Sequence, residues 1–267
     1  MFSNSIINTA LLLGPGSEGE DTNDILHHIV DHVVIPLPEV FGIDLSITLH
    51  TLWMWGVAGL LMIVLPMLFT KKQLVPKGMA NAIEAVVVFL RKDIVENYLG
   101  EDARRFEPLI FTFFFFILCN NLVGLVPGGA TPTSDLSVTG VLAMITFGTG
   151  LYAGMQKNGV WGFWKGLVPH GIPVFLIPLI AVLEVMSLFI KHFVLAMRLF
   201  ANMTAGHIAI LSLIGIVFIF KSYVVAPFPV VTAAVIGILE TLVAFLQAYI
   251  FTLLSTVFIG AAIHQEH

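Results

Sequence analysis

The chain has 267 residues, of which 58% are hydrophobic and only 11% are charged. Soluble domains carry about 25% charged residues, so this composition excludes an ordinary soluble protein. The apolar runs are far longer than the strands of a membrane barrel, and we therefore expect an all-α membrane protein. The single cysteine, Cys119, excludes an internal disulfide. We expect the lipid bilayer as a partner, and no nucleic acid.

Residues 1–46 are expected to form a polar segment outside the cytoplasm. The segment is acidic and contains no Lys or Arg, the residues that mark cytoplasmic loops. His28 and His32 are four residues apart and could share a metal ion on one helix face. A solvated amphipathic helix explains this spacing better, and we expect no metal site. Residues 47–267 would form the membrane domain.

Five membrane spans follow from the apolar runs. Basic residues come directly after the first run and after the third, so both of these runs end on the cytoplasmic side. The N-terminus then lies outside the cytoplasm and the C-terminus inside it. The expected spans are about 49–69, 109–126, 138–155, 172–220 and 230–263, and the basic residues are Lys71, Lys72, Lys77, Lys157 and Lys165.

Residues 78–98 carry too many charges for a span. They include Arg91, Lys92 and Asp93, while their apolar residues recur at helical spacing. This pattern predicts an amphipathic helix that lies on the cytoplasmic surface with its apolar face toward the membrane.

The last two apolar runs are too long for upright spans. A helix over residues 172–220 would be about 70 Å long, and one over 230–263 about 50 Å, against a hydrocarbon core of roughly 30 Å. Two arrangements explain these lengths. Either each run folds into a hairpin of two spans, or the two runs form steeply tilted helices joined by residues 222–229.

Arg198 lies deep inside the fourth run. Placing an arginine at the centre of a bilayer costs about 3 kcal/mol or more, and arginine does not lose its proton. Arg198 must therefore face a carboxylate, a water-filled cavity or a partner subunit. A structural arginine, paired within its own helix bundle, is the alternative interpretation.

Other polar residues lie at related positions on the last two helices. At about 100° per residue, Glu184, Lys191 and Asn202 fall within roughly 40° of Arg198. Glu240 and Gln247 are seven apart and share a face of the last helix. If the helices are antiparallel and Gln247 is level with Arg198, Glu240 lies near the height of His207. A carboxylate and an imidazole at matched depth form either a proton relay or a static ion pair.

Residues 197–207 carry a resemblance to a known family. They read Met-Arg-Leu-Phe-Ala-Asn-Met-Thr-Ala-Gly-His, which resembles the signature of subunit a of F-type ATP synthases. Residues 175–184, 246–251 and 120–127 resemble the same family in the fourth, last and second spans. The similarity extends over about residues 48–264, and the long N-terminal region resembles bacterial members.

The resemblance implies a mechanism. Subunit a is the stator that faces a rotating ring of subunit c, whose subunits each carry a membrane-embedded carboxylate. Arg198 would attract these carboxylates and separate two offset proton half-channels. The outer half-channel would be lined by His207, Glu240, Asn202, Gln247 and Asn120, and the inner one by Glu184, Ser187 and Lys191.

The resemblance also implies the cellular setting. The chain would be a non-catalytic, proton-translocating subunit in the bacterial plasma (inner) membrane, with subunit b and the rest of the ATP synthase as further partners and no cofactor. The last two helices of the family are long and steeply tilted. Some bacterial relatives exchange the residues at His207 and Glu240, which leaves open the group that takes the proton first.

Three alternatives remain at this point. Sodium could replace the proton as coupling ion, although imidazole is a poor sodium ligand and the His207–Glu240 pair favours protons. A secondary transporter could use Arg198 to bind an anion, but such transporters usually consist of two similar halves, and we find no internal repeat. A scaffold could use its buried charges only to fix helix register, but it would not need polar groups on opposite faces around Arg198.

Overall fold

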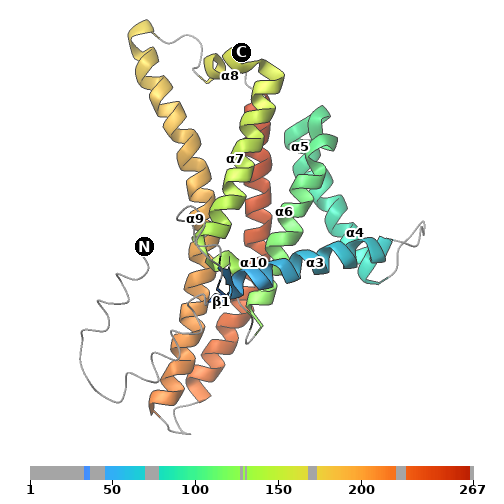
Figure 1. The fold of residues 1–267 in the computed structure, drawn as a ribbon, viewed down its shortest axis with the longest axis vertical. Helices are drawn as coiled ribbons and strands as arrows, with labels where there is room; N and C mark the ends of the chain where they lie inside the picture. The colour runs from blue at the N-terminus through green and yellow to red at the C-terminus, as the bar shows by residue number, and fades with distance from the viewer. Residues whose placement is uncertain are drawn as a thin grey trace. The chain divides into compact units, whose positions relative to one another are not determined.

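The computed structural model is almost entirely helical and describes residues 33–36, 46–69, 78–126, 129, 131–167, 173–220 and 227–264 (Figure 1). Five helical segments among these residues are long and apolar enough to cross a membrane, and the predicted fold class is confirmed. The elements are β1 (Val33–Ile35), β2 (Ile47–Thr48), α3 (Leu49–Phe69), α4 (Met79–Phe89), the π-helix η1 (Leu90–Val95), α5 (Glu96–Leu99), η2 (Gly100–Asp102), α6 (Ala103–Gly124), η3 (Pro132–Ser134), α7 (Leu136–Asn158), α8 (Val160–Gly166), η4 (Val174–Leu176), α9 (Ile177–Phe220) and α10 (Pro227–Ile263).

The chain forms two compact units. Unit 1 contains Met1–Thr48 and His207–Val235, and unit 2 contains Leu49–Gly206 and Ile236–His267. In unit 1, β1 and β2 pair antiparallel, with Val33 opposite Thr48. The remaining residues of the expected outer segment, with His28 and His32, lie outside the described residues, as do Lys71, Lys72 and Lys77.

The long apolar runs form single helices. α9 is one helix of 44 residues and α10 one of 37 residues, so the hairpin alternative is wrong for both runs. At about 1.5 Å per residue, α9 is roughly 66 Å long. The first span agrees with α3 in both bounds. The second helix begins earlier than expected, at Ala103, and continues through Pro108 in its second turn, where the missing backbone N–H removes one intrahelical hydrogen bond.

The segment from α4 to α5 packs on α6 of the same unit. Leu90 and Ile94 are fully buried in one hydrophobic cluster with Phe113 and Ile117 of α6. The charged residues of the segment are exposed, except for the half-buried Glu84. The chain reverses at Gly100, whose positive φ of 53° favours glycine. The segment is therefore amphipathic, as predicted, but its apolar face packs on the protein. Its position relative to the membrane surface stays a prediction.

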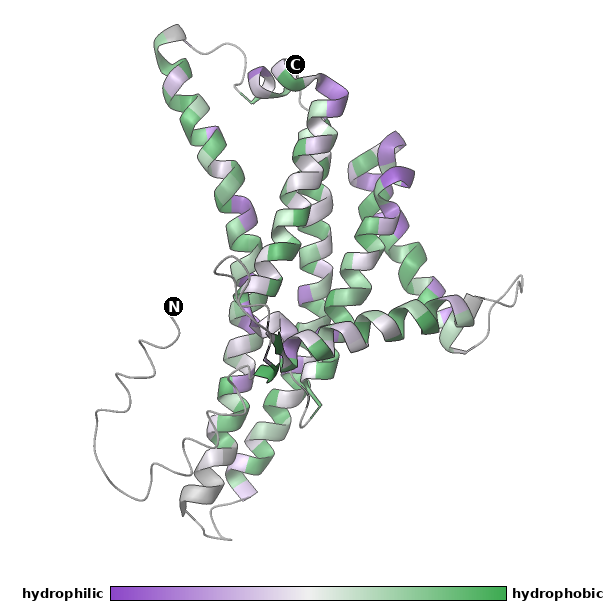
Figure 2. Cartoon of the chain, viewed as in Figure 1, coloured by the Kyte–Doolittle hydropathy of each residue, from purple (hydrophilic) through white to green (hydrophobic). Residues whose placement is uncertain are grey.

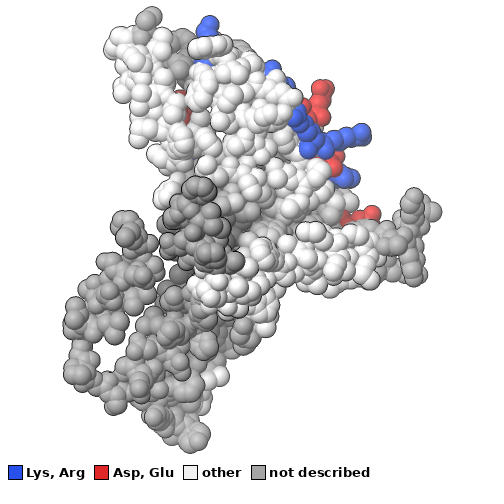
Figure 3. All heavy atoms as spheres, viewed as in Figure 1, with Lys and Arg blue, Asp and Glu red and all other residues white. Residues whose placement is uncertain are grey.

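Hydrophobic residues make up most of the described helices, as the colouring by hydropathy in Figure 2 shows. On the face that Figure 3 shows, charged side chains gather around α5 and the start of α6. Two ion pairs hold this charged region together, Arg91–Glu107 at 3.0 Å and Lys157–Asp102 at 2.6 Å.

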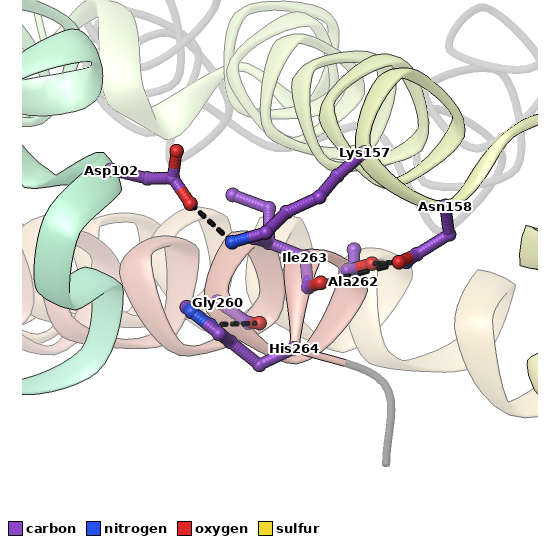
Figure 4. Close-up of polar contacts among 7 residues, drawn as sticks. All are labelled: Asp102, Lys157, Asn158, Gly260, Ala262, Ile263 and His264. Carbon is purple, nitrogen blue, oxygen red and sulfur yellow. Dashed lines mark hydrogen bonds and ion pairs between the residues drawn. The ribbon is translucent and has the colours of Figure 1, made fainter. Parts of the chain in front are cut away.

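The end of α7 is tied to the end of α10 by polar contacts (Figure 4). The side-chain amide of Asn158 donates to the carbonyl oxygens of Ala262 and Ile263 at 3.4 and 3.5 Å. The ion pair of the neighbouring Lys157 with Asp102 adds a link to η2. These contacts supply partners for backbone carbonyls that a helix end leaves without an intrahelical donor.

Candidate functional site

Arg198 lies on the exposed side of α9. Val194, one turn before it, and Ala205, about two turns after it, are exposed on the same side, so the guanidinium emerges from an apolar part of the helix surface. In the part of the chain that the structure describes, the ion pairs are Arg91–Glu107 and Lys157–Asp102, and Arg198 takes part in neither. The described residues thus give no support to a structural arginine paired within its own bundle.

The polar residues that share the stripe of Arg198 are also accessible. Lys191 and Asn202 are exposed, and Glu184 and Ser187 are half-buried. One side of α9 therefore presents a cation, an amide and a carboxyl group along more than four helical turns.

Within unit 2, α9 and α10 pack antiparallel. His192 contacts Phe258 with ring centroids 5.0 Å apart, the Asn202 amide donates to Oε1 of Gln247 at 3.5 Å, and Gly206 faces the carboxyl group of Glu240. Residue numbers thus rise along one helix as they fall along the other. Gln247 lies level with Asn202, about 6 Å or one turn beyond Arg198.

Three residues assigned to the outer path have buried polar atoms without a hydrogen-bond partner among the described residues. Asn120 is 0% exposed, Gln247 2% and Glu240 3%. The Asn120 amide donates to the Phe116 carbonyl at 2.7 Å, which leaves its Oδ1 unpartnered. Nε2 of Gln247 and both carboxyl oxygens of Glu240 are likewise unpartnered. Folded proteins bury few such atoms, and water commonly satisfies them.

Asn121 links α6 to η3 and α10 near these residues. The sequence pattern did not predict a role for it. Its Oδ1 accepts from the Thr133 hydroxyl at 2.7 Å, and its amide donates to the Ala244 carbonyl at 3.4 Å. Ala244 lies one turn from both Glu240 and Gln247 on α10. The adjacent amide pair in the second span was the signal that could have indicated this role.

His207 is half-buried and belongs to unit 1, whereas Glu240 belongs to unit 2. Their pairing stays a prediction.

Two residues of the expected inner path line the same cavity. Glu184 and Lys191 line a space of about 210 Å³ together with residues of α7, α8 and α10. Ser187 is not among the residues that line it. His192 does line the cavity, although the sequence pattern predicted no role for it. The available signal was its position directly after Lys191 in an apolar run.

No group of three His, Cys, Asp or Glu side chains among the described residues is placed to hold a metal ion. The arrangement instead combines an accessible cation with buried groups that can give, take or orient a proton. Such a combination is typical of ion paths within membrane proteins.

Comparison with known proteins identifies similar chains. The family model described as ATP synthase A chain matches residues 51–260. The protein is 44% identical to ATP synthase subunit a of Chloroherpeton thalassium over 91% of this chain and 78% of the relative. It is 42% identical to the ATP synthase subunit a of Chlorobium phaeobacteroides over 91% and 76%, and 42% identical to that of Anaeromyxobacter dehalogenans over 90% and 70%.

Proposed function

The chain belongs to the ATP synthase subunit a family, and we propose that it is the stator that moves protons to and from the ring of subunit c. It is a multi-pass membrane protein and a subunit of an F-type ATP synthase, where it takes part in ion translocation. The proposal concerns the ion, the ring, the two half-channels and the residues that act in them.

The exposed position of Arg198 carries this proposal. An arginine on an apolar surface, without an ion pair in the described chain, is stable in a bilayer only if a partner supplies the negative charge or if water reaches it. A ring carboxylate supplies this charge, and the attraction is strong where solvent screening is weak. Arg198 then releases each carboxylate as the next one arrives, and its fixed charge opposes a proton crossing directly between the half-channels.

The outer half-channel uses the buried groups of α6 and α10. The buried polar atoms of Asn120, Gln247 and Glu240 can form hydrogen bonds with a chain of water molecules. Asn202, which contacts Gln247 one turn beyond Arg198, extends this chain toward Arg198. His207 completes the set as the sequence predicts. An imidazole and a carboxyl group exchange protons readily, so the coupling ion of the proposal is the proton.

The inner half-channel uses the accessible side of α9 before Arg198. Glu184 and Lys191 line the cavity near α8, and Ser187 lies between them on the helix. Protons leave through this side into the cytoplasm of a bacterium whose plasma membrane holds the complex. Subunit b and the remaining subunits of the synthase would hold the chain still against the ring.

The experiment replaces Arg198 by Ala in the assembled complex and measures ATP-driven proton uptake into inside-out membrane vesicles. Uptake should fall to background, because nothing then attracts the ring carboxylate, while subunits a and c remain present in the membrane. Arg104→Ala, at an exposed arginine of α6, is the matched control and should keep the wild-type rate. Wild-type uptake in Arg198→Ala would refute the proposed role.

A further inference from the structure

His192 is a buried histidine with one of its two ring nitrogens in a hydrogen bond. It lies on α9, is 8% exposed, and its ring packs between Phe147 of α7 and Phe258 of α10, with centroids 5.0 Å from each. Nδ1 lies 2.8 Å from the carbonyl oxygen of Leu188. Nε2 is buried and has no partner among the described residues.

The backbone contact assigns the tautomer of this ring. A carbonyl oxygen only accepts hydrogen bonds, so Nδ1 must carry the hydrogen and donate it. In the neutral ring, Nε2 is then the atom with the free lone pair. The structure thus holds a proton acceptor in a fixed orientation inside the bundle.

The ring also lines the cavity near α8. Among the described residues that line this cavity, the titratable ones are Glu184, Lys191 and His192, all from α9. The residues that α7, α8 and α10 contribute are apolar side chains or glycines. Of the three, His192 is the nearest to Arg198 along α9, six residues or about 9 Å before it.

We propose that His192 is a proton-relay residue between this cavity and the region of Arg198, which extends the proposed function and rests on it. In ATP-driven pumping, a hydronium ion or water in the cavity donates to Nε2, so that an N–H bond forms as an O–H bond breaks. The imidazolium keeps its Nδ1–H bond to Leu188 and returns the Nε2 proton to water on the side of Arg198. The reverse sequence serves ATP synthesis.

Two substitutions separate a relay from simple packing. His192→Gln retains a side-chain donor for the Leu188 carbonyl but cannot be protonated, and His192→Phe retains an aromatic ring between Phe147 and Phe258. His264→Gln is the matched control, because His264 makes the same type of contact, from Nδ1 to the Gly260 carbonyl at 3.2 Å, but does not line the cavity (Figure 4).

The measurement is ATP-driven proton uptake into inside-out vesicles at external pH values from about 6.5 to 8.5, the range around the ordinary histidine pKa and above it. In the proposed orientation, the inner cavity faces the external medium in these vesicles. Protons become scarce there as the pH rises, so the loss of a relay should slow uptake severalfold and by a growing factor. We expect this for both His192 variants and a wild-type profile for His264→Gln.

Each other outcome overturns the relay. Wild-type rates in the His192 variants, an equal loss at every pH, or a loss in His192→Gln that His192→Phe does not show would reduce His192 to a packing residue. If subunit a with His192→Phe does not assemble into the complex, the pH profile of His192→Gln alone decides whether His192 is a relay. Arg198→Ala is measured alongside: if it keeps pumping, the proposed function fails, whereas its loss combined with normal His192 variants refutes only the relay.

Discussion

Gly206 leaves room for the carboxyl group of Glu240 beside α9. A Cβ atom at position 206 would overlap Oε1 and Cδ of Glu240. The close approach therefore requires a residue without a side chain. It places a carboxyl group that has no hydrogen-bond partner in the described part of the chain two turns from Arg198 along α9. A change that adds a single methyl group there tests the importance of this geometry.

Gly206→Ala should displace the Glu240 carboxyl group, because overpacking a close contact costs about 1–3 kcal/mol and the side chain can rotate away. We expect ATP-driven proton uptake to fall severalfold, with subunit a still present in the membrane. Gly237→Ala is the control, since a Cβ there meets nothing within 4 Å and the residue lies one turn from Glu240. Equal rates in both variants would mean that the position of the carboxyl group is not critical.

Among the helices, α10 approaches α5 closely at a single glycine. A Cβ atom at Gly260 would lie 2.6 Å from the carbonyl oxygen of Tyr98, and backbone cannot move aside as a flexible side chain does. This contact positions the last turns of α10, which also receive the amide of Asn158. The end of α10 contributes Ala261 and Ala262 to the inner cavity. Helix packing here thus shapes the cavity wall.

Gly260→Ala should therefore destabilise the packing of α10 on α5 by about 1–3 kcal/mol. The measurement is the thermal inactivation midpoint of the detergent-solubilised complex, which we expect to fall by several degrees. Gly140→Ala on α7, where a Cβ meets nothing within 4 Å, should leave the midpoint unchanged. An unchanged midpoint in Gly260→Ala would show that the helices separate there at little cost.

For the whole molecule, orientation in the membrane follows from the distribution of Lys and Arg. Lys157 and Lys165 lie near the ends of α7 and α8, and no Lys or Arg occurs between residues 106 and 156. Charge bias of this kind predicts that the basic ends lie in the cytoplasm. In this predicted orientation, the exposed residues at the start of α7 would lie on the outside, which is the side of the proposed outer half-channel.

Labelling of single cysteines tests this orientation. In a Cys119→Ser background, Ser137→Cys and Lys165→Cys place thiols at exposed positions on opposite ends of α7–α8. A membrane-impermeant maleimide should label position 137 in right-side-out vesicles and position 165 in inside-out vesicles. The opposite result would invert the topology, and with it the assignment of outer and inner paths.

The chain's own pattern determined much of this description. The length of the apolar runs predicts the number of spans and their approximate bounds, and it shows that Arg198 lies far inside one run. Run length is a local property, which can be read without knowing which residues are in contact in the fold. Helical periodicity likewise placed Glu184, Lys191 and Asn202 near the direction of Arg198, since the angle between residues of one helix depends only on their spacing. The family followed from the specific sequence around Arg198.

Only the tertiary structure decided what lies opposite each residue. It excluded hairpins for α9 and α10, packed the α4–α5 segment on α6, and placed His192 in the wall of the same cavity as Lys191. It also showed that Asn120, Gln247 and Glu240 bury polar atoms that have no hydrogen-bond partner among the described residues. These features depend on contacts between residues far apart in the chain, and such contacts have no signature in the spacing within a single helix.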